Sequence, residues 1–143
     1  MRFWDTSAIV PLLVADAATS AVEATYRQDP AMTVWWATEV ECVSAVTRLE
    51  RDGALSEASV SASLVSLRAL ASAWTSVDPL DRLREVAIRV LQTHALRAAD
   101  ALQIAAAISA AEDRPATLSL VTLDARLAQA ATREGFIVVV PGA

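Results

Sequence analysis

Two short, continuous apolar runs near the end of the chain, Leu118–Thr122 and Phe136–Val140, place the strongest constraint on its fold. Both contain β-branched residues, and such runs are typical of strands that are buried on both faces of a parallel sheet. The segment between them, Asp124–Arg133, has the length of a helix that returns the chain to a neighbouring parallel strand. The two runs therefore predict a parallel sheet with helices packed on its faces.

The same alternation of short strands and helices continues through the rest of the chain. We expect the other strands at Arg2–Asp5, Met32–Trp35 and Thr75–Val77. After Asp5 we expect a helix through Leu13 that Thr6 and Ser7 cap, and the other helices are expected at Ala17–Tyr26, Thr38–Arg51, Ser56–Trp74, Leu80–Thr93 and Ala98–Glu112. This order predicts a three-layer α/β/α domain with a mostly parallel central sheet. A chain of 143 residues with 55% hydrophobic content can bury one such core, so residues 1–143 are predicted to form a single domain.

The apolar content leaves apolar surface for a second chain, because soluble domains usually contain about 45–50% apolar residues. A candidate surface is the seam of Leu64, Leu67 and Trp74 on the second helix of a helical hairpin, which has the spacing of a groove for an amphipathic helix. The alternative is that this seam packs within the core of the monomer itself. A homodimer or another protein partner is therefore expected, but the sequence does not determine which surface binds it.

No segment of the sequence has the features of a membrane span or a secretion signal. The longest apolar segment, Ala101–Ala111, is shorter than the roughly 20 residues that a membrane-spanning helix needs, and Asp5 interrupts the apolar start of the chain. The single cysteine, Cys42, excludes an internal disulfide and fits a reducing compartment. We therefore expect a cytoplasmic protein, with Cys42 as a small buried hydrophobe.

Four acidic residues lie where the predicted fold would bring them to one edge of the sheet. Asp5 ends the first strand, and one residue separates Asp124 from the strand Leu118–Thr122. Ligands of open parallel sheets bind at the carboxyl ends of the strands. Glu41 and Asp100 lie in the first turns of two predicted helices, where the helix dipole favours negative charge. All four residues are candidates for one site.

Each acid also has a purely structural explanation. Thr38 and Glu41 have the spacing of a capping box, Asp124 can cap the helix that follows it, and Asp5 can serve as a turn residue. Asp100 could complement its helix dipole, although its alanine neighbours indicate a buried position where a carboxylate needs a partner. These explanations do not account for the shared location of the four residues. Clustered carboxylates repel one another, so together they favour a site for Mg²⁺ or Mn²⁺, whereas one His and one Cys disfavour zinc.

The order of these motifs resembles PIN-domain ribonucleases, and in particular the VapC-type toxins of bacterial toxin–antitoxin pairs. The resemblance spans the chain and rests on four segments: Phe3–Ala8 (FWDTSA), Glu41–Arg48, Leu96–Gln103 (LRAADALQ) and Val121–Asp124 leading to Gly135-Phe136. It implies a metal-dependent endoribonuclease that hydrolyses RNA phosphodiester bonds. It also implies a VapB-like antitoxin as partner and a homodimer.

The resemblance further implies that Asp5, Glu41, Asp100 and Asp124 form the catalytic metal site, supported by hydrogen bonds from Ser7 or Thr122. Glu39 is an alternative ligand to Glu41, although the spacing from Glu41 to Ala45 and Arg48 fits the family pattern better. Arg97 is a candidate contact for phosphate or for an acidic partner. The structural alternative for Arg97 is a surface ion pair.

The net charge of −5 alone would disfavour a nucleic-acid ligand, because phosphate contacts need clustered cations. Bound cations would neutralise the acids locally, so the positions of the basic residues matter more than the sum. All 12 basic residues are arginines. The absence of lysine disfavours a receiver domain and a haloacid-dehalogenase-type phosphatase, since both families resemble this pattern of acids but use a site lysine. A structure-specific DNA nuclease and a non-catalytic PIN-like binding module remain as alternatives.

Overall fold

The computed structural model describes residues 1–143, and its helices and strands alternate as the sequence predicts. In chain order the elements are β1 (Arg2–Trp4), α1 (Thr6–Leu13), α2 (Thr19–Gln28), β2 (Met32–Trp35), α3 (Thr38–Arg51), α4 (Glu57–Ala73), β3 (Thr75–Val77), α5 (Asp81–Thr93), α6 (Ala98–Ala110), β4 (Ser119–Val121), α7 (Ala125–Arg133) and β5 (Ile137–Val139). None of the helices is long and apolar enough to cross a membrane.

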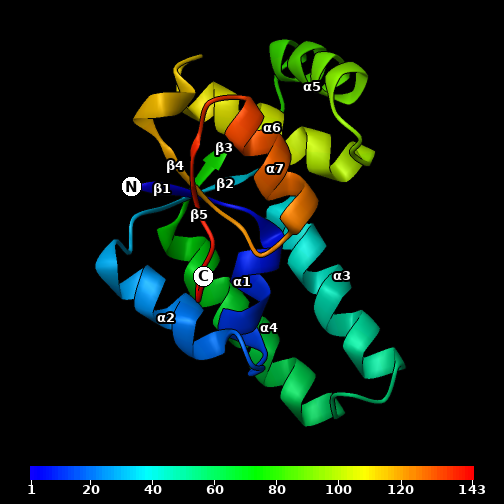
Figure 1. Ribbon diagram of the computed structural model, residues 1–143. Coiled ribbons are helices and arrows are strands. Elements are labelled where there is room, and N and C mark those ends of the chain that lie inside the picture. Colours follow the sequence, from blue (N-terminus) through cyan, green and yellow to red (C-terminus); the bar gives the residue numbers. More distant parts are fainter.

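The five strands form one sheet in the order β3-β2-β1-β4-β5, and every neighbouring pair is parallel. Helices α5, α6 and α7 cover one face of this sheet, and α1, α2 and α4 cover the other (Figure 1). The prediction of a three-layer α/β/α fold is therefore confirmed, with a sheet that is fully parallel. The central strand β1 lies between β2 and β4, so the residue that follows β1 reaches the middle of the sheet's carboxyl edge.

Alternation along the strands divides the buried residues into two cores, one on each face of the sheet. Phe3 and Leu120 contribute to the core beneath α5, α6 and α7, whereas their neighbours Trp4 and Val121 contribute to the core shared with α1 to α4. Successive side chains of a strand point to opposite faces, which explains this division. All four side chains are completely buried. Both faces of β1 and β4 are therefore fixed by packing, so the residues that follow these two strands have well-defined positions.

The prediction that Phe136–Val140 is buried on both faces is wrong. Strand β5 lies at the edge of the sheet, and Ile137 is 59% exposed. A parallel strand at an edge lacks the cover of helices that a central strand receives, so an apolar run does not by itself distinguish the two positions. The run Leu118–Thr122 does form the buried strand β4 that its composition predicts.

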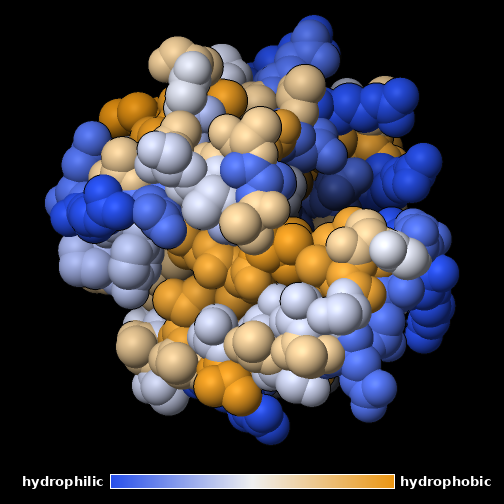
Figure 2. Space-filling model, turned by 90° about the horizontal axis from the view of Figure 1, so that it is seen from below, coloured by the Kyte–Doolittle hydropathy of each residue, from blue (hydrophilic) through white to orange (hydrophobic).

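The predicted docking seam on α4 belongs to the core of the monomer. Leu67 is 1% exposed and packs in the core on the α1 to α4 face, and Leu64 and Trp74 pack against the same core. The seam is therefore not a groove for a partner. Apolar surface is found elsewhere, since Figure 2 shows an apolar patch on the underside of the molecule.

Candidate active site

An open pocket of about 670 Å³ lies next to the carboxyl ends of the central strands. The side chains around it are Glu41, Arg48, Arg97, Ala99, Asp100, Asp124, Ala125 and Arg126. Three of the four predicted acids thus line one pocket, and they come from the first turns of α3 and α6 and from the residue before α7. The fourth, Asp5, follows β1 and is 4% exposed. It lies close enough for its charge to raise the pKa of Glu41.

Asp5 is fixed by hydrogen bonds that all reach one of its two carboxylate oxygens. The hydroxyl and backbone N–H of Ser7 donate to Oδ2, and the hydroxyl of Thr122 donates to the same atom at 2.9 Å. The bond from the Ser7 N–H makes Asp5 the N-cap of α1, so the prediction that Thr6 and Ser7 cap this helix is wrong. The other oxygen, Oδ1, accepts no hydrogen bond from the protein and is free for a ligand.

Glu41 is held by two side chains from other elements. Thr6 Oγ1 donates to Oε2 at 3.1 Å, and the amide of Gln103 approaches Oε1 at 3.2 Å. The capping box expected of Thr38 and Glu41 is not formed, because Ala37 is the N-cap of α3 and no side chain caps this end. A role in helix capping therefore does not explain Glu41, whose carboxylate is directed toward the other site residues.

Asp124 combines the structural and the functional roles that the sequence left open. Its Oδ1 accepts a hydrogen bond from the backbone N–H of Leu127 at 2.9 Å, which caps α7. Its own backbone N–H donates to the hydroxyl of Thr122, the residue that also holds Asp5. Because one carboxylate oxygen suffices for the cap, the second remains available at the pocket.

The acids raise one another's pKa values, as expected for carboxylates that share a site. Burial raises the pKa of Asp5, of Glu41 and of Asp100. The negative charge of Asp100 raises the pKa of Asp5 and of Glu41 further, and that of Asp124 raises the pKa of Asp100. Hydrogen bonds from Ser7 and Thr122 partly counteract this effect at Asp5.

The donor set fits a hard divalent cation, although the side chains do not form a preassembled metal cluster. No three His, Cys, Asp or Glu side chains are arranged so that they could hold a metal ion as they stand. The free Oδ1 of Asp5 and the three acids at the pocket nevertheless offer only carboxylate oxygens, the ligands that Mg²⁺ and Mn²⁺ prefer. A cation there would also relieve the repulsion that raises the pKa values.

Unpaired arginines surround these acids. Arg48, Arg97 and Arg126 line the pocket, and none of them makes an ion pair. The surface ion pair considered for Arg97 is therefore absent. The net negative charge of the chain conceals these three arginines, two of which, Arg97 and Arg126, lower the pKa of Asp100 by their charge. We call Asp100, Asp124 and these three arginines the rim of the site, and Asp5 and Glu41 with their hydrogen-bond donors the floor.

The other residues singled out in the sequence lie away from the pocket or are inert. Glu39 is exposed and is not among the pocket residues. Cys42 is buried, and burial raises the pKa of its thiol to about 12, so it is no nucleophile at neutral pH. His94 ends α5, and its ring is hydrogen-bonded to Glu134 at 2.8 Å.

Thr6 and Gln103 were not identified as site residues from the sequence. Gln103 is 1% exposed, and its Nε2 lies within hydrogen-bond distance of Glu41 and of the hydroxyls of Thr6 and Thr38. The signal was a polar residue on the otherwise apolar face of α6, one turn after Asp100. A buried amide requires a hydrogen-bond partner, and in the structure one partner of Gln103 is the carboxylate of Glu41.

Comparison with known proteins shows the family. Residues 2–133 match the model of the PIN domain, so this chain belongs to the PIN domain family. PIN domains are generally nucleases. A comparison with curated proteins gave no match.

Solved structures share the fold at low sequence identity. The crystal structure of PAE2754 from Pyrobaculum aerophilum is 21% identical, with a TM-score of 0.63 over 96% of this chain and 88% of that one. FitAcB from Neisseria gonorrhoeae is 18% identical, with a TM-score of 0.64 over 99% of this chain and 97% of that one. FitAB bound to an IR36 DNA fragment is also 18% identical, with a TM-score of 0.68 over 99% and 95% of the two chains.

Proposed function

We propose that this chain is a single-domain, Mg²⁺- or Mn²⁺-dependent endoribonuclease that acts as the toxin of a toxin–antitoxin pair. The observation that carries the proposal is that Glu41, Asp100 and Asp124 line one pocket, with Asp5 buried beside it, and that the same pocket carries three arginines without ion pairs. Carboxylates alone would repel a phosphodiester, and arginines alone would bind it without hydrolysis. Both together suit a nuclease that holds a cation and a phosphate side by side.

The protein groups would divide the work between floor and rim. Asp5, Glu41, Asp100 and Asp124 would hold the divalent ion, which supplies Lewis-acid stabilisation of charge on the phosphate oxygens. Ser7 and Thr122 fix the orientation of Asp5, while Thr6 and Gln103 fix that of Glu41. The guanidinium groups of the rim are suited to phosphate oxygens, because their N–H donors match the geometry of an oxyanion.

RNA is preferred to DNA as the substrate because the domain is small. Its 143 residues form the sheet, its helices and short connections, without an insertion that could clamp a DNA duplex. The pocket is open to solvent, which suits a flexible single strand. The toxin assignment, the VapB-like antitoxin and the homodimer rest on the resemblance to VapC-type proteins.

The proposal is tested by cleavage of a labelled single-stranded RNA in the presence of Mn²⁺ or Mg²⁺. We expect Asp100→Asn to lower the rate by about 100-fold or more, the size of effect seen when one electrostatic group of an active site is removed. Asp52→Asn is the matched control, because Asp52 is exposed at the far end of α3. Its rate should equal that of the parent.

Four outcomes would change the proposal. Cleavage by Asp100→Asn at the parent rate would show that the proposed catalytic site is wrong. Full activity after treatment with EDTA would exclude metal-assisted hydrolysis. Faster cleavage of a single-stranded or flap DNA than of RNA would favour the structure-specific DNA nuclease, and no cleavage of either would favour the non-catalytic binding module.

The protein partners require separate tests. Light scattering at micromolar concentration should give the mass of a dimer, and a monomer would contradict the proposed homodimer. The antitoxin should be encoded by a short neighbouring reading frame, and its product should copurify with this chain and inhibit the cleavage of RNA. An apolar pocket between α1 and α4, lined in part by Leu13, Val14 and Leu55, offers a surface for it now that the α4 seam is excluded.

A further inference from the structure

A second pocket lies beside the acidic one, between α7 and the connection from α5 to α6. Its volume is about 350 Å³, and its lining includes Leu96, Arg126, Gln129, Ala130 and Arg133. This volume lies at the lower end of the range for small-ligand sites, about 300–1,000 Å³. Arg126 lines both pockets, so the second pocket continues directly from the acidic one.

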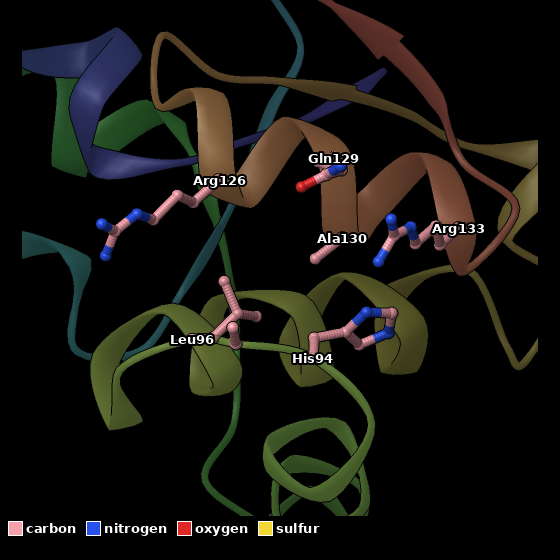
Figure 3. Close-up of a pocket in the computed structure, with 7 residues that line it drawn as sticks. His94, Leu96, Arg126, Gln129, Ala130 and Arg133 are labelled. Carbon is pink, nitrogen blue, oxygen red and sulfur yellow. The ribbon is translucent and has the colours of Figure 1, made fainter.

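The polar residues of this pocket lie along one face of α7. Arg126, Gln129 and Arg133 follow one another at helical spacing, and Figure 3 shows Gln129 between the two arginines with Leu96 and His94 opposite. The seven steps from Arg126 to Arg133 correspond to about 10 Å along the helix axis. The pocket is therefore a short track with an arginine at each end of the α7 side and the apolar side chain of Leu96 opposite.

Neither arginine makes an ion pair within the protein, although the charge of Arg126 lowers the pKa of the nearby Asp100. Both are exposed and make no ion pair, whereas the neighbouring Arg89 is paired with Glu134 at 3.0 Å. The position of Arg126 is also unfavourable for its own helix, because it lies in the first turn of α7, where the helix dipole disfavours positive charge. Stability of the helix thus does not explain this arginine, which lies between the carboxylate of Asp100 and the second pocket and can face an anionic ligand there.

We propose that this second pocket binds the nucleotide next to the scissile phosphate of a single-stranded nucleic acid. Arg126 and Arg133 contact consecutive backbone phosphates, Leu96 and Ala130 pack against the base or sugar, and Gln129 supplies a polar contact. The buried ring of His94, fixed by Glu134, forms the wall of the pocket. The inference rests on the proposed nuclease function and extends it to a substrate subsite.

A nucleic acid fits this track better than an acidic protein segment does. A strand that crosses from one pocket to the other meets three carboxylates in the acidic pocket. Phosphates can approach those carboxylates through the divalent cation that the site would hold, whereas the side chains of an acidic peptide would compete with the same acids for it.

The experiment measures binding of a fluorescent single-stranded 12-mer RNA by anisotropy, with Asp100→Asn as the background so that the RNA stays intact. We expect Arg133→Gln to weaken binding about tenfold, and the slope of log K against log salt to become shallower by about 0.7 for the lost phosphate contact. Gln129→Glu should weaken binding more strongly, since it places a carboxylate between the two arginines. Arg68→Gln is the matched control, because it removes one exposed arginine on α4, a helix that does not line the pocket.

The outcomes separate this inference from the proposed function. If the parent cleaves RNA but Arg133→Gln binds with the affinity and salt slope of Arg68→Gln, the subsite is wrong and the nuclease stands. If the parent does not cleave RNA, the nuclease proposal fails whatever the binding shows. A single-stranded DNA 12-mer that shows the same losses leaves the subsite intact and broadens its ligand. If Arg133→Gln instead loses only the binding of a glutamate-rich peptide, the pocket serves an acidic protein segment and the proposal is overturned.

Discussion

The floor and the rim of the acidic pocket are built in different ways. On the floor, Asp5 is 4% exposed and accepts three hydrogen bonds on one oxygen, and Glu41 is held by two side chains from other elements. On the rim, Arg48, Arg97 and Arg126 have no ionic partner at all. The floor is fixed before any ligand arrives, whereas the rim is left for the ligand to complete.

This difference indicates which property each substitution should change. A buried carboxylate with a raised pKa opposes folding at neutral pH, so a change on the floor should alter both stability and activity. A change of a rim arginine should alter activity or binding with little effect on stability, since exposed side chains without ion pairs contribute little to folding. The following predictions test this division, beginning with the largest effect.

Asp124 provides the strongest test because it caps α7 and lines the pocket. Both Asp124→Asn and Asp124→Ala should lower RNA cleavage by about 100-fold or more, since neither replaces the charge. Only Asp124→Ala should lose stability, by about 1 kcal/mol, because Asn is an equally good N-cap and Ala is not. Denaturant unfolding and cleavage assays on the two variants would show this. Equal activity of Asp124→Asn and the parent would show that Asp124 serves only as the N-cap of α7.

The acids of the site, on the floor and on the rim, should make the stability of the protein depend on metal and pH together. Because the pKa values of Asp5, Glu41 and Asp100 are raised in the fold, their contribution to stability is present below the ordinary pKa of about 4 and is lost as the pH rises through the raised values. The protein in EDTA should therefore become less stable with rising pH. Mn²⁺ at 100 times its Kd should add about 2.7 kcal/mol, and this gain should increase with pH as the carboxylates ionise.

Thermal unfolding with and without Mn²⁺ between pH 4 and 8 would measure this linkage. The double variant Asp5→Asn/Asp124→Asn is the control. In it the gain from Mn²⁺ should be largely lost, and the destabilisation with rising pH should be smaller but still present, because burial still raises the pKa of Glu41 and of Asp100. A gain from Mn²⁺ that survives in the double variant would place the ion elsewhere.

Gln103 should have an intermediate effect, through Glu41. The hydrogen bond from Gln103 lowers the pKa of Glu41, so Gln103→Leu should raise this pKa and shift the acidic limb of the pH–rate profile to higher pH. The rate at neutral pH should fall about tenfold, as for other residues that orient a metal ligand. The cost in stability should be small, because the variant also removes a buried acceptor, Gln103 Oε1, that has no partner.

Thr38→Val is the matched control for this effect. It removes a hydroxyl that the same amide contacts, without changing Glu41 or its other donor, Thr6. The pH–rate profile of Thr38→Val should match that of the parent. If both variants shift the profile equally, the effect comes from packing around α6 and not from the orientation of Glu41.

The sequence predicted the positions of the strands, helices and acidic residues better than the contacts between distant residues. Alternation and apolar runs determine strands such as β4, and the strand ends then determine where Asp5 and Asp124 emerge. The exposure of Ile137 depends on the order of strands in the sheet, which no local pattern encodes. The hydrogen bond from Gln103 to Glu41 joins residues that are 62 positions apart. Local spacing predicts a capping box for Glu41. In the structure the Glu41 carboxylate instead accepts a hydrogen bond from Gln103 of α6.

The smallest expected effect decides between the two glutamates at the start of α3. Glu39→Gln should leave RNA cleavage within about twofold of the parent, because Glu39 is exposed and does not line the pocket. Its stability should fall by only about 0.3–1 kcal/mol, the contribution of a negative charge in the first turn of a helix. Glu41→Gln makes the same chemical change two residues later, and it should lower cleavage by about 100-fold, because it removes the charge that Thr6 and Gln103 hold at the site. Comparing the two rates at one Mn²⁺ concentration removes general effects of charge on RNA binding. Loss of activity in Glu39→Gln alone would transfer the metal ligand to Glu39 and require the start of α3 to turn toward the pocket when the ion binds.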